Sequence, residues 1–420
     1  MTKGRDAVEK KGAGGLFTCF FILLVLSIPA YFLSPANFEL MDLPEFYTPA
    51  KMILSGHGSS IYDVPSLKAA EKALFPWMKA ESIVLYLPPF AVPWLVPSGF
   101  VPEAAIGPVW WLSLLISTVG ALALLRNCFG LSERALLWTG TILSAFGPEW
   151  ESIKHGQLAP FLLLSLSLAI WALKRDHPRL CAGAFSFLLL KPHLLLPFLA
   201  YLTGARRYRP ILYLALPAAL LIGLSLLMVG PAGYKDYQAL MSYSFVHRQW
   251  MAPEAGPTIR GQLLRFLGDQ DALVLNVSST VSALTLVALF AAGRRLSASE
   301  QWLEKGVIMS VPLALVTALH CHNYDLLLLL PPFIALTGST FIQKLPRLAL
   351  LSLILPGTIF MMPFYNKIHY EYLLTGGKLN PFFLVLAGFC IFTLALSLRL
   401  TPSEKQKVDT SSSKKGERTA

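Results

Sequence analysis

Charge is what this chain of 420 residues has least of: 14% of its residues are Asp, Glu, Lys or Arg, whereas 55% are hydrophobic. Soluble globular domains carry about 25% charged residues, so the shortage argues against an ordinary soluble domain. A transmembrane β-barrel would show ~10-residue segments of alternating polarity, but the apolar runs here are continuous, as in Leu158 to Leu173. The sequence therefore predicts an all-α, polytopic helical membrane protein.

Cysteine is also scarce. The five cysteines form no CxxC pair, and most lie in or beside apolar runs (Cys19, Cys128, Cys181, Cys321 and Cys390). This scatter argues against a disulfide framework or a zinc site. We expect the cysteines to be packing residues.

Basic residues outnumber acidic ones, with a net charge of +11, but they occur in short clusters between apolar runs. This pattern is typical of cytoplasmic loops rather than of a nucleic-acid-binding surface, and no nucleic-acid partner is expected. We predict three parts: a basic cytoplasmic segment at 1–15, a membrane domain at 16–400, and a polar, disordered cytoplasmic tail at 401–420. The run from Leu16 to Leu33 is too long for a signal peptide core, so we expect it to be the first span. We also expect a plasma-membrane location, with both termini in the cytoplasm.

Alternation of basic loops and apolar runs predicts about twelve crossings. Large extracytoplasmic loops are expected at 34–82 and 230–271. The stretch from Tyr86 to Pro102 contains four prolines before its last residue, namely Pro88, Pro89, Pro93 and Pro97. Because proline interrupts helical hydrogen bonding, we expect this stretch to be re-entrant. The run from Leu180 to Tyr201 lies between two basic clusters, which predicts two short half-helices hinged at Lys191-Pro192.

With this topology, four polar clusters fall on the outer side of the membrane. Ionisable residues at membrane depth are costly and are functional candidates by default. The clusters are Asp42 with Glu45, His155-Gly156-Gln157, Lys191-Pro192-His193, and His320 to Asp325.

Each charged candidate also has a structural interpretation. Asp42 is placed to act as a general base, but Leu43-Pro44 follows it, which is typical of a helix N-cap. Glu45, three residues on, suits a capping partner better than a second catalytic carboxylate. Lys191 is suited to pair with a phosphate or to extend its amine to the headgroups.

The uncharged candidates likewise have both a functional and a structural interpretation. Gln157 is suited to bind a sugar or to cap a helix. His320 and His322, with Asp325, resemble a metal-ligand cluster, but no third strong ligand accompanies them, and we expect no metal. Tyr86 belongs to a set of aromatic residues that a membrane-interface belt explains, with stacking on a sugar as the alternative.

Five segments in order resemble glycosyltransferase family 87 of the GT-C superfamily. The first is similar to that family's first outer loop, the second to its Tyr-x-Pro-Pro-Phe segment, and the third to its Gly-Gln opening of a long span. The fourth resembles its Leu-Lys-Pro hairpin and the fifth its His…Tyr-Asp-Leu segment. In the same order, the five segments of this chain are DLPEFYTPAKMILSGHGSSIYD, YLPPFAVPWLVP, HGQLAPFLLLSLSLAIWALKR, GAFSFLLLKPHLLLPFLAYL and HCHNYDLLLLLPP. The resemblance runs from about Leu16 to Leu336, and Pro44 and Pro49 depart from it.

The resemblance implies a GT-C-like membrane enzyme that moves a hexose, usually mannose, from a polyprenyl-phosphate donor to a lipid or glycan acceptor outside the cytoplasm. Asp42 would be the base of an inverting transfer. Lys191, or Arg248 or Arg260 in the second outer loop, would stabilise the departing phosphate. No cofactor beyond the donor substrate is implied, and a divalent metal has no supporting ligand set. The rival is a transporter or flippase of a lipid-linked sugar, since broken helices occur there too; the one-sided polar clusters and the absence of an evident inverted repeat favour the enzyme.

Overall fold

A computed structural model of the chain describes residues 42–76, 84–247, 253–268, 270–338, 357–362, 364–373 and 375–399, with a few residues between 15 and 25. Within these ranges every regular element is a helix, apart from an isolated bridge between Phe146 and Met361. The all-α prediction is therefore confirmed for the part of the chain that the structure covers.

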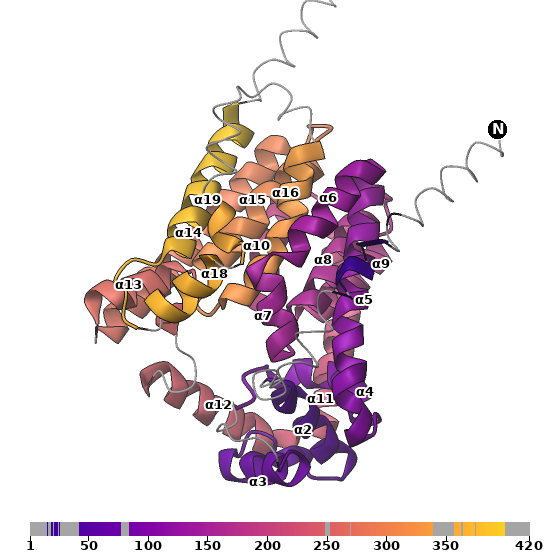
Figure 1. Ribbon diagram of the computed structural model, residues 1–420, viewed down its shortest axis with the longest axis vertical. Coiled ribbons are helices and arrows are strands. Elements are labelled where there is room, and N and C mark those ends of the chain that lie inside the picture. The colour runs from indigo at the N-terminus through magenta and orange to yellow at the C-terminus, as the bar shows by residue number, and fades with distance from the viewer. Residues whose placement is uncertain are drawn as a thin grey trace, which may run out of the picture.

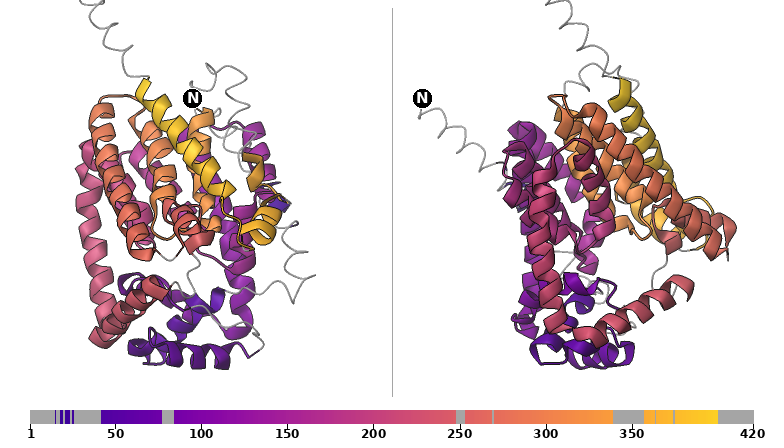
Figure 2. Two further views of the ribbon diagram at one scale, coloured as in Figure 1. Left: turned by 90° about the vertical axis from the view of Figure 1, so that its left-hand side faces the viewer. Right: turned by 180° about the vertical axis from the view of Figure 1, so that it is seen from behind.

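The helices form two groups that lie side by side (Figures 1 and 2). In the first group, α5 packs on α8, α8 on α9, and α9 on α11. In the second, α10 packs on α14 and α15, and α15 also contacts α16 and α19. The bounds are α5 Glu103–Phe129, α6 Glu133–Ser144, α7 Gly147–His155, α8 Ala159–Lys174, α9 Pro178–Leu188, α11 Tyr208–Met228, α10 Pro192–Gly204, α14 Asp271–Leu296, α15 Trp302–Thr317, α16 Leu330–Gly338 and α19 Pro381–Arg399.

Shorter helices gather at one end of these groups, the lower end in Figure 1. The polar stretch expected as the first outer loop folds into α2 (Leu43–Leu54), the 3₁₀ turn η1 (Gly58–Ser60) and α3 (Val64–Leu74). The second expected loop folds into α12 (Gly230–His247), η3 (Pro253–Ala255) and α13 (Ile259–Leu267). Because α12 packs on η1, the two polar stretches meet at this end of the molecule.

Proline and glycine end the helices where the site is built. The proline-rich stretch forms only η2 (Pro89–Trp94) and the short α4 (Val96–Gly99), in agreement with the expectation that no regular helix crosses there. Gly156 ends α7 in the left-handed conformation, and α8 leaves at 119° to α7. The predicted break at Lys191-Pro192 is confirmed: α9 ends at Leu188, α10 begins at Pro192, and the chain passes there from the first group to the second.

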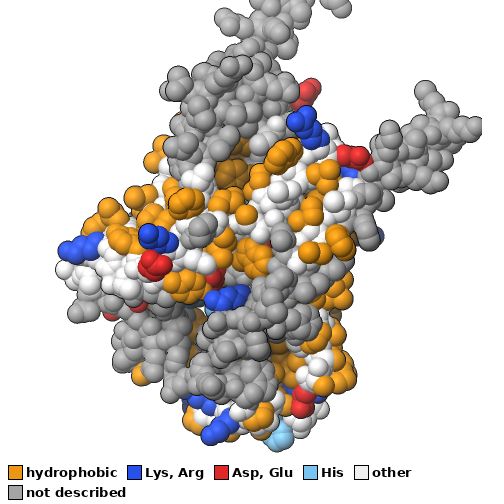
Figure 3. All heavy atoms as spheres, viewed as in Figure 1, with side chains coloured by type: hydrophobic (Ala, Val, Ile, Leu, Met, Phe, Trp, Pro, Cys, Tyr) orange, Lys and Arg blue, Asp and Glu red, His pale blue; other side chains and the backbone are white. Residues whose placement is uncertain are grey.

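Three described helices, α5, α11 and α14, are long and apolar enough to cross a membrane, and a fourth span results if the bent pair α7–α8 is one. Exposed leucines along α11, among them Leu212, Leu216, Leu220 and Leu227, give that helix an outward apolar face. Hydrophobic side chains likewise cover much of the described surface in Figure 3. The chain is therefore a membrane protein, whereas about twelve crossings remains a prediction.

Several predictions concern residues outside the described ranges. They are the cytoplasmic segment 1–15 except for its last residue, nearly all of the first span from Leu16 to Leu33, Arg248, and the tail 401–420. Most of the apolar run from Leu348 to Met362 also lies outside them.

Candidate functional site

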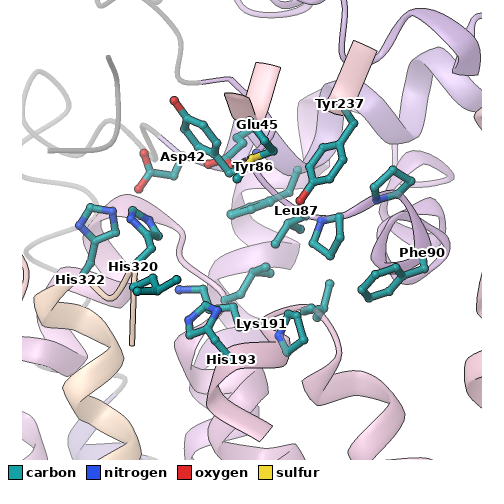
Figure 4. A pocket seen from close by; sticks show the side chains of 18 of the residues that line it. Asp42, Glu45, Tyr86, Leu87, Phe90, Lys191, His193, Tyr237, His320 and His322 are labelled. Atoms are coloured by element: carbon teal, nitrogen blue, oxygen red, sulfur yellow. Dashed lines mark hydrogen bonds between the residues drawn. The ribbon is translucent and has the colours of Figure 1, made fainter. Parts of the chain in front are cut away.

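A cavity of about 560 Å³ lies where the short helices meet the bundle. Its wall comes from the start of α2, the proline-rich stretch, the α7–α8 bend, the α9–α10 break, α12, and the segment after α15. Figure 4 shows Asp42, His320 and His322 on one side of this cavity and Phe90 on the other. Seven of the sequence-predicted site residues line it: Asp42, Glu45, Tyr86, Gln157, Lys191, His320 and His322.

Asp42 occupies the N-cap position of α2, but its side chain makes no capping hydrogen bond. Its Oδ2 instead accepts a hydrogen bond of 2.5 Å from Gln157 Nε2, and its backbone N–H donates to the His155 carbonyl oxygen at 3.0 Å. The capping interpretation is therefore wrong for the Asp42 side chain. Its carboxylate is held at the cavity by the residues that follow α7.

Burial raises the pKa of Asp42, and the positive charge of His155 and the Gln157 hydrogen bond oppose that rise. Burial raises the pKa of Glu45 well above its ordinary value, and the negative charge of Asp42 raises it further. Of the two carboxyls, Asp42 has the stronger support for its ionised form. The pair can therefore present one carboxylate and one protonated acid to a ligand.

Glu45 was expected to cap α2, but its side chain reaches across to the proline-rich stretch. Its Oε1 accepts a long hydrogen bond of 3.4 Å from the Tyr86 backbone N–H. The Tyr86 hydroxyl in turn donates to Ser244 Oγ of α12 at 3.4 Å. Tyr86 thus links α2 to α12 along the cavity wall, a role that differs from a membrane-interface belt.

Lys191 stands at the break before α10, and its residue is only 9% exposed. Its Nζ lies 2.7 Å from Asp325 Oδ1 and 2.9 Å from Oδ2, and 4.9 Å from the centre of the Tyr324 ring. The amine is therefore paired inside the protein and does not extend to the headgroups. An ammonium has three N–H donors, and the two directed at Asp325 leave one for a ligand in the cavity.

His320 and His322 lie edge to face, with ring centres 4.5 Å apart. Burial lowers the pKa of His320 well below its ordinary value, and burial with the nearby Lys191 charge lowers that of His322 to about 4. Both rings are therefore neutral near pH 7 and can each donate or accept a hydrogen bond. Among the described residues, no group of three or more His, Cys, Asp or Glu side chains is arranged to hold a metal ion.

Arg260 does not line the cavity. It is buried in α13, where its Nη1 donates to the Leu319 carbonyl oxygen at 3.0 Å. The guanidinium thus holds the backbone beside His320, because a buried arginine needs partners for its donors. The expectation that Arg260 stabilises a departing phosphate has no support from its position.

Sequence reasoning missed a network behind Asp42. Glu151 of α7 pairs with His155 at 3.0 Å, and its Oε1 accepts a 2.7 Å hydrogen bond from the Tyr370 hydroxyl. Tyr370 belongs to the π-helix η7 (Lys367–Leu373). The i, i+4 spacing of Glu151 and His155 was a usable signal, but nothing in the sequence connects either residue with Tyr370.

The sequence model of the family described as glycosyltransferase family 87 matches residues 85–319 of the chain. This range covers the proline-rich stretch, the α7–α8 bend and the break at Lys191, and it ends immediately before His320. No curated protein matches the chain. No solved structure matches it either.

Proposed function

The chain belongs to glycosyltransferase family 87, and from this premise we propose that it transfers a hexose, mannose in the first instance, from a polyprenyl phosphate to a lipid or glycan acceptor. The transfer is an inverting single displacement on the extracytoplasmic side of the plasma membrane, with both chain termini in the cytoplasm. Asp42 is the base. The observation that supports this most is that the Asp42 carboxylate and the Lys191 amine line one cavity.

In this mechanism the acceptor hydroxyl attacks the anomeric carbon from the face opposite the phosphate. Its proton goes to Asp42, a bond forms between the acceptor oxygen and the anomeric carbon, and the bond from that carbon to the phosphate oxygen breaks. The electron pair leaves with the polyprenyl phosphate, which remains an anion and needs no general acid. One carboxylate therefore suffices, and the stereochemistry at the anomeric carbon is inverted.

Stabilisation of the leaving phosphate falls to the positive end of the cavity. The remaining N–H of Lys191 is suited to a phosphate oxygen. Neutral His320 and His322 supply hydrogen bonds to the phosphate or to sugar hydroxyls without adding a second full charge. Gln157 holds Asp42 in place and Glu45, in its protonated form, can donate to the sugar.

The test is transfer of labelled mannose from polyprenyl phosphate in membranes that contain the wild-type chain or Asp42→Asn. The substitution keeps the shape but removes the base, and we expect the rate to fall by about 10² to 10⁴. Asp63→Asn is the matched control, because Asp63 caps α3 through the Ser66 N–H, lies outside the cavity lining, and asparagine caps equally well.

Full activity in Asp42→Asn would remove Asp42 as the base. A wild-type chain that transfers no sugar from any lipid phosphate, but moves such lipids between leaflets, would establish the flippase instead. Equal losses of transfer activity in Asp42→Asn and Asp63→Asn would indicate a general defect of the outer helices and would not support Asp42 as the base.

A further inference from the structure

The turn that ends α7 is bonded to other elements on two sides. Gly156 adopts the left-handed conformation there, and its carbonyl oxygen accepts a 2.8 Å hydrogen bond from the Trp110 indole of α5. On the other side, the Asp42 backbone N–H donates to the His155 carbonyl oxygen, and Gln157 donates to the Asp42 carboxylate. The end of α7 therefore fixes the position of Asp42.

One helical turn earlier, α7 carries the carboxylate that holds the His155 ring. His155 Nε2 lies 3.0 Å from Glu151 Oε2, and Glu151 Oε1 accepts the 2.7 Å hydrogen bond from the Tyr370 hydroxyl. Both oxygens of Glu151, which is only 6% exposed, thus have a partner, as a buried carboxylate requires. The His155 ring lies within the electrostatic reach of Asp42 as well, and two carboxylates favour its charged form.

Tyr370 is itself held by α7. Lys154 Nζ donates to the Tyr370 hydroxyl at 3.4 Å and lies 5.0 Å from the centre of its ring. The neighbouring His369 shares a 2.8 Å hydrogen bond with Asn323, at the start of the 3₁₀ helix η4 (Asn323–Leu329). The π-helix η7 therefore connects α7 to η4, and π-helical turns occur frequently at functional sites. η7 lies beyond the range that the family model matches.

The pair on α7 acts on Asp42 mainly through its positive member. Burial raises the pKa of Asp42, and the charge of His155 is the largest influence against that rise, ahead of the charge of Lys191. The other ionisable groups that act on Asp42 are Glu45, Glu151, Tyr324 and Tyr370. Those that act on His155, besides the two carboxylates, are Lys154, His322 and His369.

We propose that Glu151, His155 and Tyr370 form a positioning unit that keeps Asp42 ionised as the base of the transfer. The proposal rests on the proposed function. None of the three residues lines the cavity, so they act through Asp42 and not on the substrate. His155 supplies the positive charge, Glu151 keeps the imidazole charged and oriented, and Tyr370 holds Glu151.

The test is the pH dependence of kcat/KM for mannose transfer from polyprenyl phosphate by the full chain in membranes. His155→Gln removes the charge, and we expect the acidic limb to move to higher pH by about one unit. The rate at high pH should be retained, because Asp42 is ionised there in either case. Tyr370→Phe removes only a hydroxyl and should move the limb in the same direction by less. The double variant should move it no further than His155→Gln, because Tyr370 acts through His155.

Tyr372→Phe is the matched control. Tyr372 lies on the same π-helix, but it is 41% exposed and lies outside the cavity lining. Loss of its hydroxyl should leave the acidic limb in place. Each limb is compared with the high-pH rate of the same variant, so a change in the amount of folded protein does not move it.

An acidic limb that stays in place in both single variants, or a rate that falls by the same factor at every pH, would overturn the inference. Shifts that add in the double variant would also overturn it, since Tyr370 would then act on Asp42 independently of His155. If His155→Gln does not fold, the limb of Tyr370→Phe, which keeps the ring and its packing, decides alone. A wild-type chain that transfers no mannose, or full activity in Asp42→Asn, would instead contradict the proposed function, so the two failures are distinguishable.

Discussion

Asp42 is subject to opposing influences on its proton affinity. Burial raises its pKa, whereas the charge of His155 and the hydrogen bond from Gln157 lower it. A base must be unprotonated, so transfer should decline as the pH falls through the raised pKa, at a higher pH than an ordinary aspartate would give. The hydrogen bond from Gln157 is the influence that a single substitution removes most cleanly.

We predict that Gln157→Leu moves the acidic limb of the kcat/KM profile to higher pH by about one unit. The reason is that a hydrogen bond to a charged group contributes about 1.5–3 kcal/mol, and one pKa unit corresponds to about 1.4 kcal/mol. Gln301→Leu is the control, since Gln301 precedes α15 and makes no side-chain cap bond. A lower rate without movement of the limb would mean that Gln157 only contacts the sugar.

Variants of the Lys191–Asp325 pair distinguish a structural role of the pair from a role in the transfer reaction. We predict that Lys191→Ala costs about 3–5 kcal/mol of unfolding free energy, because it leaves the buried Asp325 carboxylate with the His322 backbone N–H but without its cationic partner. The double variant Lys191→Met/Asp325→Leu should recover part of that stability, less the hydrogen bond that Asp325 accepts from the His322 N–H, yet remain inactive because no amine meets the phosphate. Thermal unfolding in detergent and mannose transfer measure the two effects, and an active double variant would show that the pair only holds the fold.

At the scale of elements, a polar cluster joins α13 to α19. Asn380 Oδ1 accepts hydrogen bonds from the backbone N–H groups of Phe382 and Phe383. Its Nδ2 donates to the Gly256 carbonyl, and its own N–H donates to Gln262 Oε1. One fully buried side chain thus caps α19 and attaches it to the segment before α13.

We predict that Asn380→Ala lowers the unfolding free energy by about 1–3 kcal/mol, from the lost cap and the unpaired Gly256 carbonyl. Asn127→Ala is the control, because Asn127 is exposed on α5. The measurement is the thermal unfolding midpoint in detergent. An unchanged midpoint for Asn380→Ala would mean that water molecules replace the hydrogen bonds of the Asn380 side chain, and that water reaches the junction between α13 and α19.

For the whole molecule, the second helical group depends on close contact between α10 and α14. A Cβ atom on Gly204 would collide with the Phe290 carbonyl oxygen, and one on Gly293 with the Tyr201 carbonyl oxygen. Small residues allow helix backbones to approach where lipid provides no hydrophobic driving force. These two glycines therefore set the distance between the helices.

We predict that Gly293→Val costs about 1–3 kcal/mol through overpacking and lowers the yield of folded protein. Gly223→Val is the control, because Gly223 also lies in a candidate membrane helix, α11, but has open space around it and should tolerate the change. Size-exclusion profiles and unfolding midpoints in detergent give the comparison. Comparable losses in both variants would trace the effect to helix propensity and not to packing.

The family followed from the resemblance of five segments to glycosyltransferase family 87, whereas the sequence by itself determined the class of the protein and the helical secondary structure of its described residues. Those properties depend on composition and on neighbours along the chain: continuous apolar runs, proline at helix starts, and glycine at helix ends. The break at Lys191-Pro192 and the absence of a long helix between Tyr86 and Pro102 could be predicted for the same reason, because proline acts on its own segment.

Only the tertiary structure decided which polar groups face one another. Gln157 and Asp42 are 115 positions apart, and Lys191 and Asp325 are 134 apart, so their pairing depends on how two helical groups pack. The same packing turned Glu45 from an expected cap into a partner of Tyr86 and placed Arg260 behind the site. Local rules describe helix ends well, but a buried charge takes the partner that the fold brings to it, and that partner is not encoded nearby in the chain.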